Sequence, residues 1–143
     1  MITRLIYFSE NCLNKGLTDI RQILKSAFKN NNNLQISGIL YHNEFYFLQV
    51  LEGNREDISK VFQKINVDNR HKNVVIVSVD EAEERTFKDW GMLYVNEATI
   101  PAEELKAYLK DGKFNPKTMT SEQIKQMALG IKSKYASSVD ETE

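Results

Sequence analysis

Gln49 is the polar residue whose place in the sequence is hardest to explain by packing alone. In the strand predicted over residues 45–52, it projects to the same face as Phe47 and Leu51, so apolar side chains flank it on both sides. A buried amide without a hydrogen-bond partner costs about 1–3 kcal/mol. We therefore expect Gln49 to meet either a backbone group at a sheet edge or a polar group of a ligand.

Tyr7 lies in the middle of the strand predicted over residues 2–9, which carries apolar or aromatic side chains on both faces. Such a strand is central and covered on two sides, and it can neighbour the strand that carries Gln49. A buried tyrosine hydroxyl also needs a hydrogen-bond partner. Tyr7 is either an ordinary core aromatic or one half of a phenol–amide pair, and the pair is more informative than either residue alone.

Other chemical signals are missing from the sequence. It has no glycine-rich nucleotide loop, no zinc-protease motif, no paired cysteines and no nucleophile elbow, so a hydrolase or a kinase has no support. His42 and His71 have no companion at metal-ligand spacing, and we expect surface or turn histidines rather than a metal site. The single cysteine, Cys12, cannot form an internal disulfide, which is typical of a reducing cytoplasm.

The composition is that of one small domain with a short appendage. The chain has 143 residues, of which 41% are hydrophobic. Its 19 lysines and arginines nearly balance its 20 aspartates and glutamates, which disfavours nucleic acid or an anionic membrane surface as a partner. No apolar run is long enough for a transmembrane helix, and no secretion signal is present. We therefore expect a cytoplasmic protein.

The hydrophobic periodicity predicts the element order β-α-β-β-α-β. Apolar residues at helical spacing follow Thr18 and recur over residues 58–65. Strands are predicted over residues 34–41 and 45–52, joined as a hairpin, and the apolar, β-branched run 74–79 predicts a buried strand. This order is the ferredoxin-like α+β arrangement, which places both helices on one face of a four-stranded sheet.

The C-terminal third is predicted to extend this fold. Residues 92–95 add a fifth strand, and helices are expected over about residues 102–109 and after Thr120, which forms a capping-box pair with Gln123. The face of the sheet away from the first two helices carries apolar residues that need cover, namely Ile6, Phe8, Leu48 and Val50. We expect the C-terminal helices, a second subunit or both to cover it.

Five stretches stand in order along residues 5–95: Leu5-Ile6-Tyr7-Phe8-Ser9, Asn31 with Ile36-Ser37-Gly38-Ile39-Leu40, Phe47-Leu48-Gln49-Val50-Leu51-Glu52-Gly53, Asp68-Asn69-Arg70-His71 and Arg85-Thr86-Phe87-Lys88-Asp89-Trp90-Gly91-Met92. In order and spacing they resemble the BLUF domains, which sense blue light using flavin. Two departures are small. Ser37 replaces a usual threonine and keeps the hydroxyl, and Asn69 replaces a common proline.

The resemblance implies a flavin held non-covalently between the first two helices, on the sheet face that bears Tyr7 and Gln49. FAD is the expected cofactor, with FMN and riboflavin as alternatives. The other implied binding residues are Ile23, Leu40 and Ile65 as apolar walls, Asn30 and Asn31 at the ring, and Lys29, Arg70 and His71 toward the phosphates.

The resemblance also implies a photocycle rather than an enzymatic reaction. Tyr7 gives an electron and then a proton to the excited flavin, and Gln49 changes its hydrogen bonding, which shifts the absorption slightly to the red. The signal is expected to pass through Trp90 and Met92 to the helices after Ile100, and from there to a downstream partner protein. Residues 1–97 would form the flavin-binding domain and residues 98–143 a helical extension, in a homo-oligomer.

Three alternatives compete with this interpretation. Asn11-Cys12 suggests the LOV type of flavin photosensor, but Leu13-Asn14 follow where that type has arginine and phenylalanine, so Cys12 is expected to be incidental. A ferredoxin-like module that binds a metabolite without sensing light would be colourless. A redox flavoenzyme would need substrate-binding residues or a hydride-donor motif, and none is recognisable.

Overall fold

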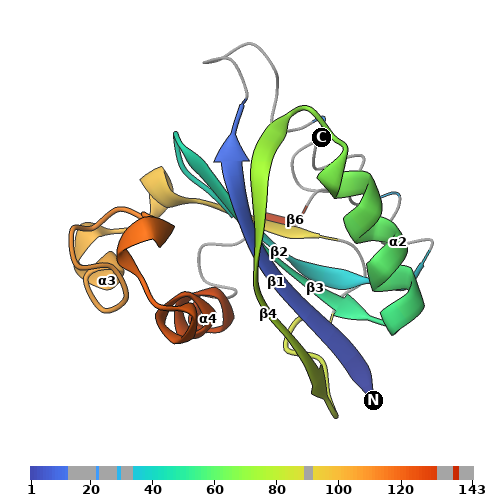
Figure 1. Ribbon diagram of the computed structural model, residues 1–143. Helices are drawn as coiled ribbons and strands as arrows, with labels where there is room; N and C mark the ends of the chain where they lie inside the picture. Colours follow the sequence, from blue (N-terminus) through green and yellow to red (C-terminus); the bar gives the residue numbers. More distant parts are fainter. Residues whose placement is uncertain (13–21, 23–28, 30–33, 89–91, 132–136, 139–143) are drawn as a thin grey trace.

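One mixed β-sheet organises the chain. The computed structural model describes residues 1–12, 22, 29, 34–88, 92–131 and 137–138. The strands are β1 (Ile2–Asn11), β2 (Ser37–His42), β3 (Tyr46–Gly53), β4 (His71–Ala82), β5 (Leu93–Asn96) and β6 (Ser137–Ser138). Their order across the sheet is β4-β1-β3-β2-β5-β6, and the hairpin β2–β3 lies near its middle (Figure 1).

The first four strands have the ferredoxin-like order, as predicted. β1 pairs antiparallel with both β3 and β4, and β2 pairs antiparallel with β3. The predicted fifth strand is β5, which runs parallel to β2. Helix α2 (Arg55–Asn66) is the predicted second helix, and its first turn is capped by the side chain of Asn54. The helix predicted after Thr18 lies outside the described residues, apart from Gln22 and Lys29, which are helical.

Glycine is required at position 38, where two strand backbones approach closely. A Cβ atom added to Gly38 would lie 1.8 Å from the carbonyl oxygen of Val50, which no side chain can accommodate without moving a strand. This contact lies between β2 and β3, where Gly38 pairs with Leu51. The glycine therefore fixes how closely the strand that carries Gln49 packs against its neighbour.

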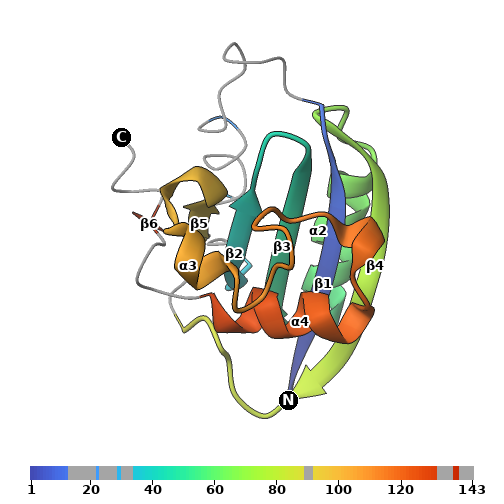
Figure 2. The same cartoon turned by 90° about the vertical axis from the view of Figure 1, so that its left-hand side faces the viewer.

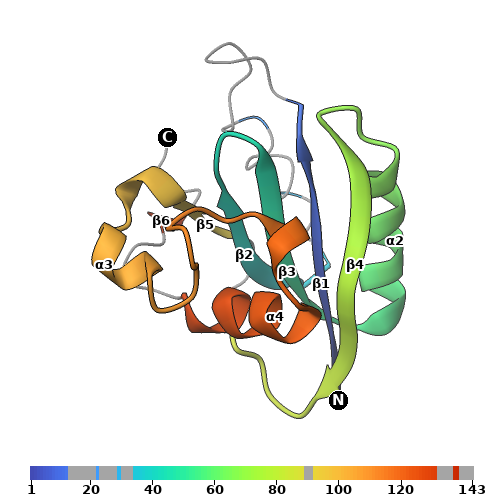
Figure 3. The same cartoon turned by 60° about the vertical axis from the view of Figure 1, so that its left-hand side comes forward.

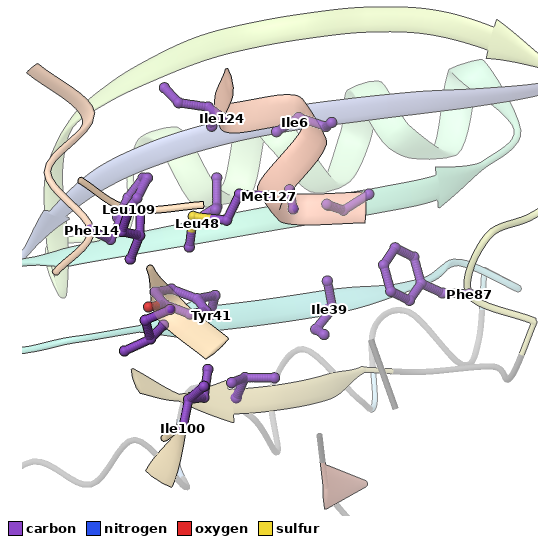
Figure 4. Packing of buried hydrophobic residues seen from close by; sticks show 14 residues of the cluster. Ile6, Ile39, Tyr41, Leu48, Phe87, Ile100, Leu109, Phe114, Ile124 and Met127 are labelled. Carbon is purple, nitrogen blue, oxygen red and sulfur yellow. The ribbon is translucent and has the colours of Figure 1, made fainter. Parts of the chain in front are cut away.

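The C-terminal segments cover one face of the sheet. Helices α3 (Ala102–Leu105) and α4 (Ser121–Gly130) lie on the side opposite α2, and α4 contacts β3 and β4 (Figure 2). The predicted capping box of Thr120 and Gln123 is present at the start of α4. The core on this face includes Ile6, Ile39, Tyr41, Leu48, Val50, Leu109, Phe114, Ile124 and Met127 (Figure 4). The C-terminal helices thus cover the apolar face of the sheet, as expected from the sequence.

A second core cluster lies on the α2 side of the sheet, and this is the side that carries Tyr7. Figure 3 shows α2 beside β4 on this face, with α4 across the other. The buried members of the cluster are Leu5, Tyr7, Ile36, Leu40, Phe47, Leu51, Ile58, Val61 and Met92. The two faces of the sheet therefore have separate cores.

The prediction of a buried strand over residues 74–79 is wrong, because β4 lies at the edge of the sheet. Val75 is 43% exposed, Ile76 51% and Val79 57%. In the order β4-β1-β3-β2 the last strand of the motif pairs with β1 alone, so its apolar content does not report burial. The register of β4 against β1 also shifts twice. Asn73, which has a positive φ of 52°, lies at the second shift, between Lys72 and Val75, the partners of Glu10 and Phe8.

The helix predicted over residues 102–109 is shorter than expected. α3 ends at Leu105, and the next residues form turns, with the amide of Tyr108 bonded to the carbonyl of Leu105 at 3.0 Å. Gly112 follows with φ of +74°. These turns bring Leu105, Leu109 and Phe114 into the same apolar cluster.

Candidate functional site

Tyr7 and Gln49 face one another directly across two paired strands. Tyr7 of β1 is opposite Gln49 of β3, and Gln49 is opposite Leu40 of β2. Directly opposed residues project to the same face, so the three side chains form a row across the centre of the sheet. Tyr7 is 1% exposed, Gln49 4% and Leu40 2%. The predicted neighbourhood of Tyr7 and Gln49 on one face is confirmed.

The amide of Gln49 joins the phenol to a thioether. The hydroxyl of Tyr7 donates a hydrogen bond to Oε1 of Gln49. On the other side, Nε2 of Gln49 donates to Sδ of Met92 at 3.7 Å. A thioether sulfur is a weak acceptor, so the donor half of this amide is poorly satisfied compared with its acceptor half. The residues described around Gln49 thus leave a buried N–H able to serve a stronger acceptor.

The surroundings of Tyr7 keep its phenol neutral. Burial, together with the negative charge of nearby Asp68, raises the pKa of Tyr7 well above its ordinary value. The ring of Phe62 on α2 meets the ring of Tyr7 edge to face, with centroids 5.7 Å apart and planes at 69°. Tyr7 is therefore protonated at physiological pH, and its proton becomes acidic only if the phenol is first oxidised.

Several of the other predicted site residues can be placed. Leu40 and Met92 are buried in the same cluster as Tyr7, and Ile65 of α2 packs against that cluster while half-buried. Arg70 lies in the turn before β4 and forms an ion pair with Asp68, whose Oδ2 is 2.5 Å from Nη2. Lys29 is exposed.

The remaining predicted positions are not placed by the structure. The backbone of His71 begins β4, and its side chain lies outside the described part of the molecule. Ile23, Asn30, Asn31 and Trp90 lie outside the described residues altogether. The cofactor-binding roles assigned to all these residues therefore stay predictions.

Sequence reasoning missed three contributors to this region. Phe62 lies within the helical pattern predicted over residues 58–65, and its spacing from Ile58 directs it toward the sheet, where it meets Tyr7. Asp68 belongs to the stretch 68–71, and its electrostatic effect on Tyr7 depends on three-dimensional proximity. His42 is stacked on Tyr94 of β5 with ring centroids 6.1 Å apart, although it was expected to lie in a turn or on the surface. The alternation of β2 was a usable signal, because it places His42 on the face of Leu40.

The described residues contain neither a group of metal ligands nor a helix that could span a membrane. Within them, no group of three histidine, cysteine, aspartate or glutamate side chains is arranged to hold a metal ion. No helix among them is both long and apolar enough to cross a membrane. Cys12 is exposed.

Comparison with known proteins agrees with the geometry. A profile of the BLUF family, described as sensors of blue light using FAD, matches residues 2–93. The blue light- and temperature-regulated antirepressor BluF of Escherichia coli K12 is 34% identical over 92 residues, which cover 64% of this chain and 23% of that protein. The chain thus spans less than a quarter of that relative.

Solved structures extend the likeness over the whole chain. The ground state of BlsA is 28% identical, with a TM-score of 0.79 over 100% of this chain and 99% of that one. Klebsiella pneumoniae BlrP1 with FMN and cyclic diGMP is 27% identical, with a TM-score of 0.70 over 92% of this chain and 36% of that one. The match to the family profile covers well over half of the sequence and includes both Tyr7 and Gln49. The chain therefore belongs to the BLUF family, the sensors of blue light using FAD.

Proposed function

We propose that this protein is a blue-light photoreceptor that binds a flavin non-covalently and uses Tyr7 and Gln49 to convert illumination into a change of hydrogen bonding. The observation that carries the proposal is the buried pair itself, in which the hydroxyl of Tyr7 donates to the amide of Gln49 at the centre of the sheet. A purely structural glutamine at this depth would have strong partners on both halves of its amide.

The residues present fit a flavin. The edge of a flavin ring carries carbonyl and ring-nitrogen acceptors beside an N–H donor, and an amide can meet both kinds of group without adding charge. Gln49 has its N–H side directed at a weak thioether acceptor, so a flavin carbonyl or ring nitrogen would be a better partner. Leu40 and Ile65 supply apolar surface on the same side of the sheet.

Each side chain of the pair has a distinct role in the proposed photocycle. When bound, the flavin supplies absorption of blue light and a site that accepts an electron. Tyr7 gives up the electron and then its proton, because a phenol becomes strongly acidic on oxidation. Gln49, hydrogen-bonded to that hydroxyl, must rearrange when the proton leaves and returns, and the new arrangement is the signalling state. No bond of a substrate is made or broken, and we propose that the chain is not an enzyme.

FAD is the flavin we propose for this chain. The description of the family supports FAD, whereas the relative BlrP1 was solved with FMN. FAD and FMN share the same ring, so only the residues that face the phosphate side of the cofactor can discriminate between them. Of these, Arg70 already pairs with Asp68 and offers a partly neutralised charge, and Lys29 is exposed. Identification of the flavin released by denaturing the purified protein decides between them.

The output is proposed to leave the site through Met92. This residue contacts Gln49 and directly precedes β5, which leads to the C-terminal helices. Residues 1–97 then form the flavin-binding domain and residues 98–143 the output extension. A downstream signalling protein is the proposed partner, contacted by a homo-oligomer in the cytoplasm, with Trp90 taking part in the relay.

One spectroscopic experiment tests the proposal. The protein is purified in the dark, and its visible spectrum is recorded before and after blue light. We expect flavin absorption bands that shift slightly to the red on illumination and return in the dark. A protein that stays colourless after incubation with FAD would refute the photoreceptor function and favour a metabolite-binding module. A flavin spectrum that light leaves unchanged would also refute it.

A further inference from the structure

Glu52 is a buried carboxylate that takes no part in the electron and proton transfer proposed for Tyr7 and Gln49. It lies three positions after Gln49 on β3 and is fully buried. Its carboxylate accepts from Nε of Arg4 at 2.8 Å, from the amide of Thr86 at 2.9 Å and from the amide of Phe87 at 2.7 Å. A carboxylate at this depth keeps its charge only with such a complete set of donors. The set of donors ties the loop after β4 to the sheet.

Arg85 fastens the same loop from a second direction. Its guanidinium donates to Oγ of Ser37, to the carbonyl oxygen of Glu52 and to the carbonyl oxygen of Gln35, each at 2.8 Å. A guanidinium holds several acceptors in a rigid fork, which fixes direction as well as distance. Residues 85–87 are therefore bound to β3, to the start of β2 and, through Arg4, to β1.

The anchored segment and Met92 belong to the cores on opposite faces of the sheet. The ring of Phe87 belongs to the core on the α4 side and lies at the end of that cluster nearest Ile39 (Figure 4). Met92, a few residues later, belongs to the core on the α2 side, where its sulfur accepts from Gln49. Phe87 and Met92 are only five positions apart in the sequence, and Met92 directly precedes β5, whose Leu93 pairs with Ile39 of β2. The anchor at residues 85–87 therefore holds the chain on one side of Met92, and the pairing of β5 with β2 holds it on the other.

We propose that Glu52 is a positioning residue of the photocycle, which holds residues 85–87 on the sheet and so keeps Met92 against the amide of Gln49 in the dark state. This inference rests on the proposed photoreceptor function. When Gln49 rearranges, its contact with Met92 changes as well, and the anchored segment favours the return of Met92 to its starting place. Loosening the anchor therefore destabilises the dark state relative to the signalling state.

The test uses Glu52→Gln in the full-length, flavin-loaded protein. Glutamine has nearly the same shape, but its amide replaces one of the two oxygens that accept from Arg4, Thr86 and Phe87 by a donor. We expect the variant to keep its flavin and the size of its red shift, while recovery in the dark slows at least about fivefold, as for the loss of a charge-assisted hydrogen bond. Amide hydrogen exchange of residues 83–88 in the dark should become faster.

Glu97→Gln is the matched control. Glu97 is also a buried carboxylate, 8% exposed, and it accepts from the amide of Phe114 at 2.7 Å. It follows β5, at the opposite end of that strand from Met92. We expect this variant to lose stability but to recover in the dark at the parent rate, with unchanged exchange of residues 83–88.

The outcomes separate this inference from the photoreceptor function. A parent protein without a red shift refutes the function itself. A parent that shifts, with a Glu52→Gln variant that recovers at the parent rate or faster, overturns the positioning role alone. If Glu52→Gln does not fold, Arg85→Lys takes its place, since lysine keeps the charge but lacks the second nitrogen and the rigid planar fork with which Arg85 donates to its acceptors. Slower recovery in Arg85→Lys supports the role, and the parent rate overturns it.

Discussion

Each face of the sheet buries a tyrosine, and the two hydroxyls donate to different acceptors. On the α2 side, Tyr7 donates to the neutral amide of Gln49. On the α4 side, Tyr41 donates to the carboxylate of Glu97 at 2.5 Å. Burial raises the pKa of both phenols above its ordinary value, and a nearby carboxylate adds to the effect, Asp68 for Tyr7 and Glu97 for Tyr41. Both hydroxyls are protonated at physiological pH.

The two acceptors, Glu97 and Gln49, differ in their other hydrogen-bond partners. Glu97 also accepts from the backbone amide of Phe114 and from the side-chain amide of Asn43, at 2.7 and 3.4 Å. It can only accept, so it has one way to satisfy these donors. Gln49 can donate or accept, and its N–H side meets only a thioether among the described residues. The pair of Tyr41 and Glu97 thus anchors the C-terminal segment to the hairpin, whereas the pair of Tyr7 and Gln49 can rearrange.

Replacing the two tyrosines by phenylalanine tests this contrast most strongly at Tyr7. The change Tyr7→Phe removes the hydroxyl with little change in volume, so the fold and the flavin should remain. Because the proposed electron and proton donor is lost, we expect the light-induced red shift to disappear. The measurement is the difference spectrum before and after blue light. A red shift of parental size and recovery in Tyr7→Phe would refute the role of Tyr7.

Tyr41→Phe should give the opposite result, with the photocycle kept and stability lost. The variant leaves Glu97 buried with one donor fewer, and a hydrogen bond to a charged group contributes about 1.5–3 kcal/mol. We expect the free energy of unfolding, measured by urea denaturation, to fall by about 2 kcal/mol. The red shift and the dark recovery of this variant should match the parent. A lost red shift in Tyr41→Phe would remove the contrast between the two faces.

The α2 side of the sheet was largely predictable from the sequence. The alternation of apolar residues placed Tyr7 and Gln49 on inward faces of two strands, and the ferredoxin-like order made those strands neighbours. Both features depend on local periodicity and on a topology rule, and these act along the chain. The direct opposition of Tyr7 and Gln49 needed the register of β1 and β3, which the sequence alone leaves open.

The anchors of the α4 side were not predictable in the same way. Glu97 and Glu52 look like ordinary surface carboxylates in the sequence, because their donors come from distant segments such as Phe114 and Phe87. The exposure of β4 is a different case. The predicted ferredoxin-like order already places the last strand at the edge of the sheet, but the apolar run in β4 is also typical of a buried strand, and the observed order shows that Val79 is exposed. Contacts between distant segments decide these features, and periodicity does not encode them.

A smaller effect is expected from His42, which lies on the same face as Gln49. Within the described structure its Nε2 is buried without a hydrogen-bond partner, and burial lowers its pKa from 6.5 to about 4. The unfolded chain therefore binds a proton before the folded one as the pH falls. Stability is full above about pH 6.5 and declines toward about pH 4, by about 1.4 kcal/mol at about pH 5.5.

His42→Phe isolates this contribution, since phenylalanine keeps the stacking on Tyr94 without a titrating group. Urea denaturation of both proteins at neutral pH and at about pH 5.5 should show that the variant loses about 1.4 kcal/mol less on acidification than the parent. Equal losses in the two proteins would show that His42 is protonated in the fold at that pH.

The smallest effect is expected at the ion pair that links α4 to the edge strand. Nζ of Lys125 lies 2.8 Å from Oδ2 of Asp80, and the two side chains are 31% and 39% exposed. Solvent screens such a pair, so Lys125→Met should lower the free energy of unfolding by less than about 1 kcal/mol, and less still at high salt. Lys117→Met, at an exposed lysine outside α4, controls for the added methionine. A loss of several kcal/mol in Lys125→Met alone would mean that charge, rather than the apolar packing of Ile124 and Met127, holds α4 on the sheet.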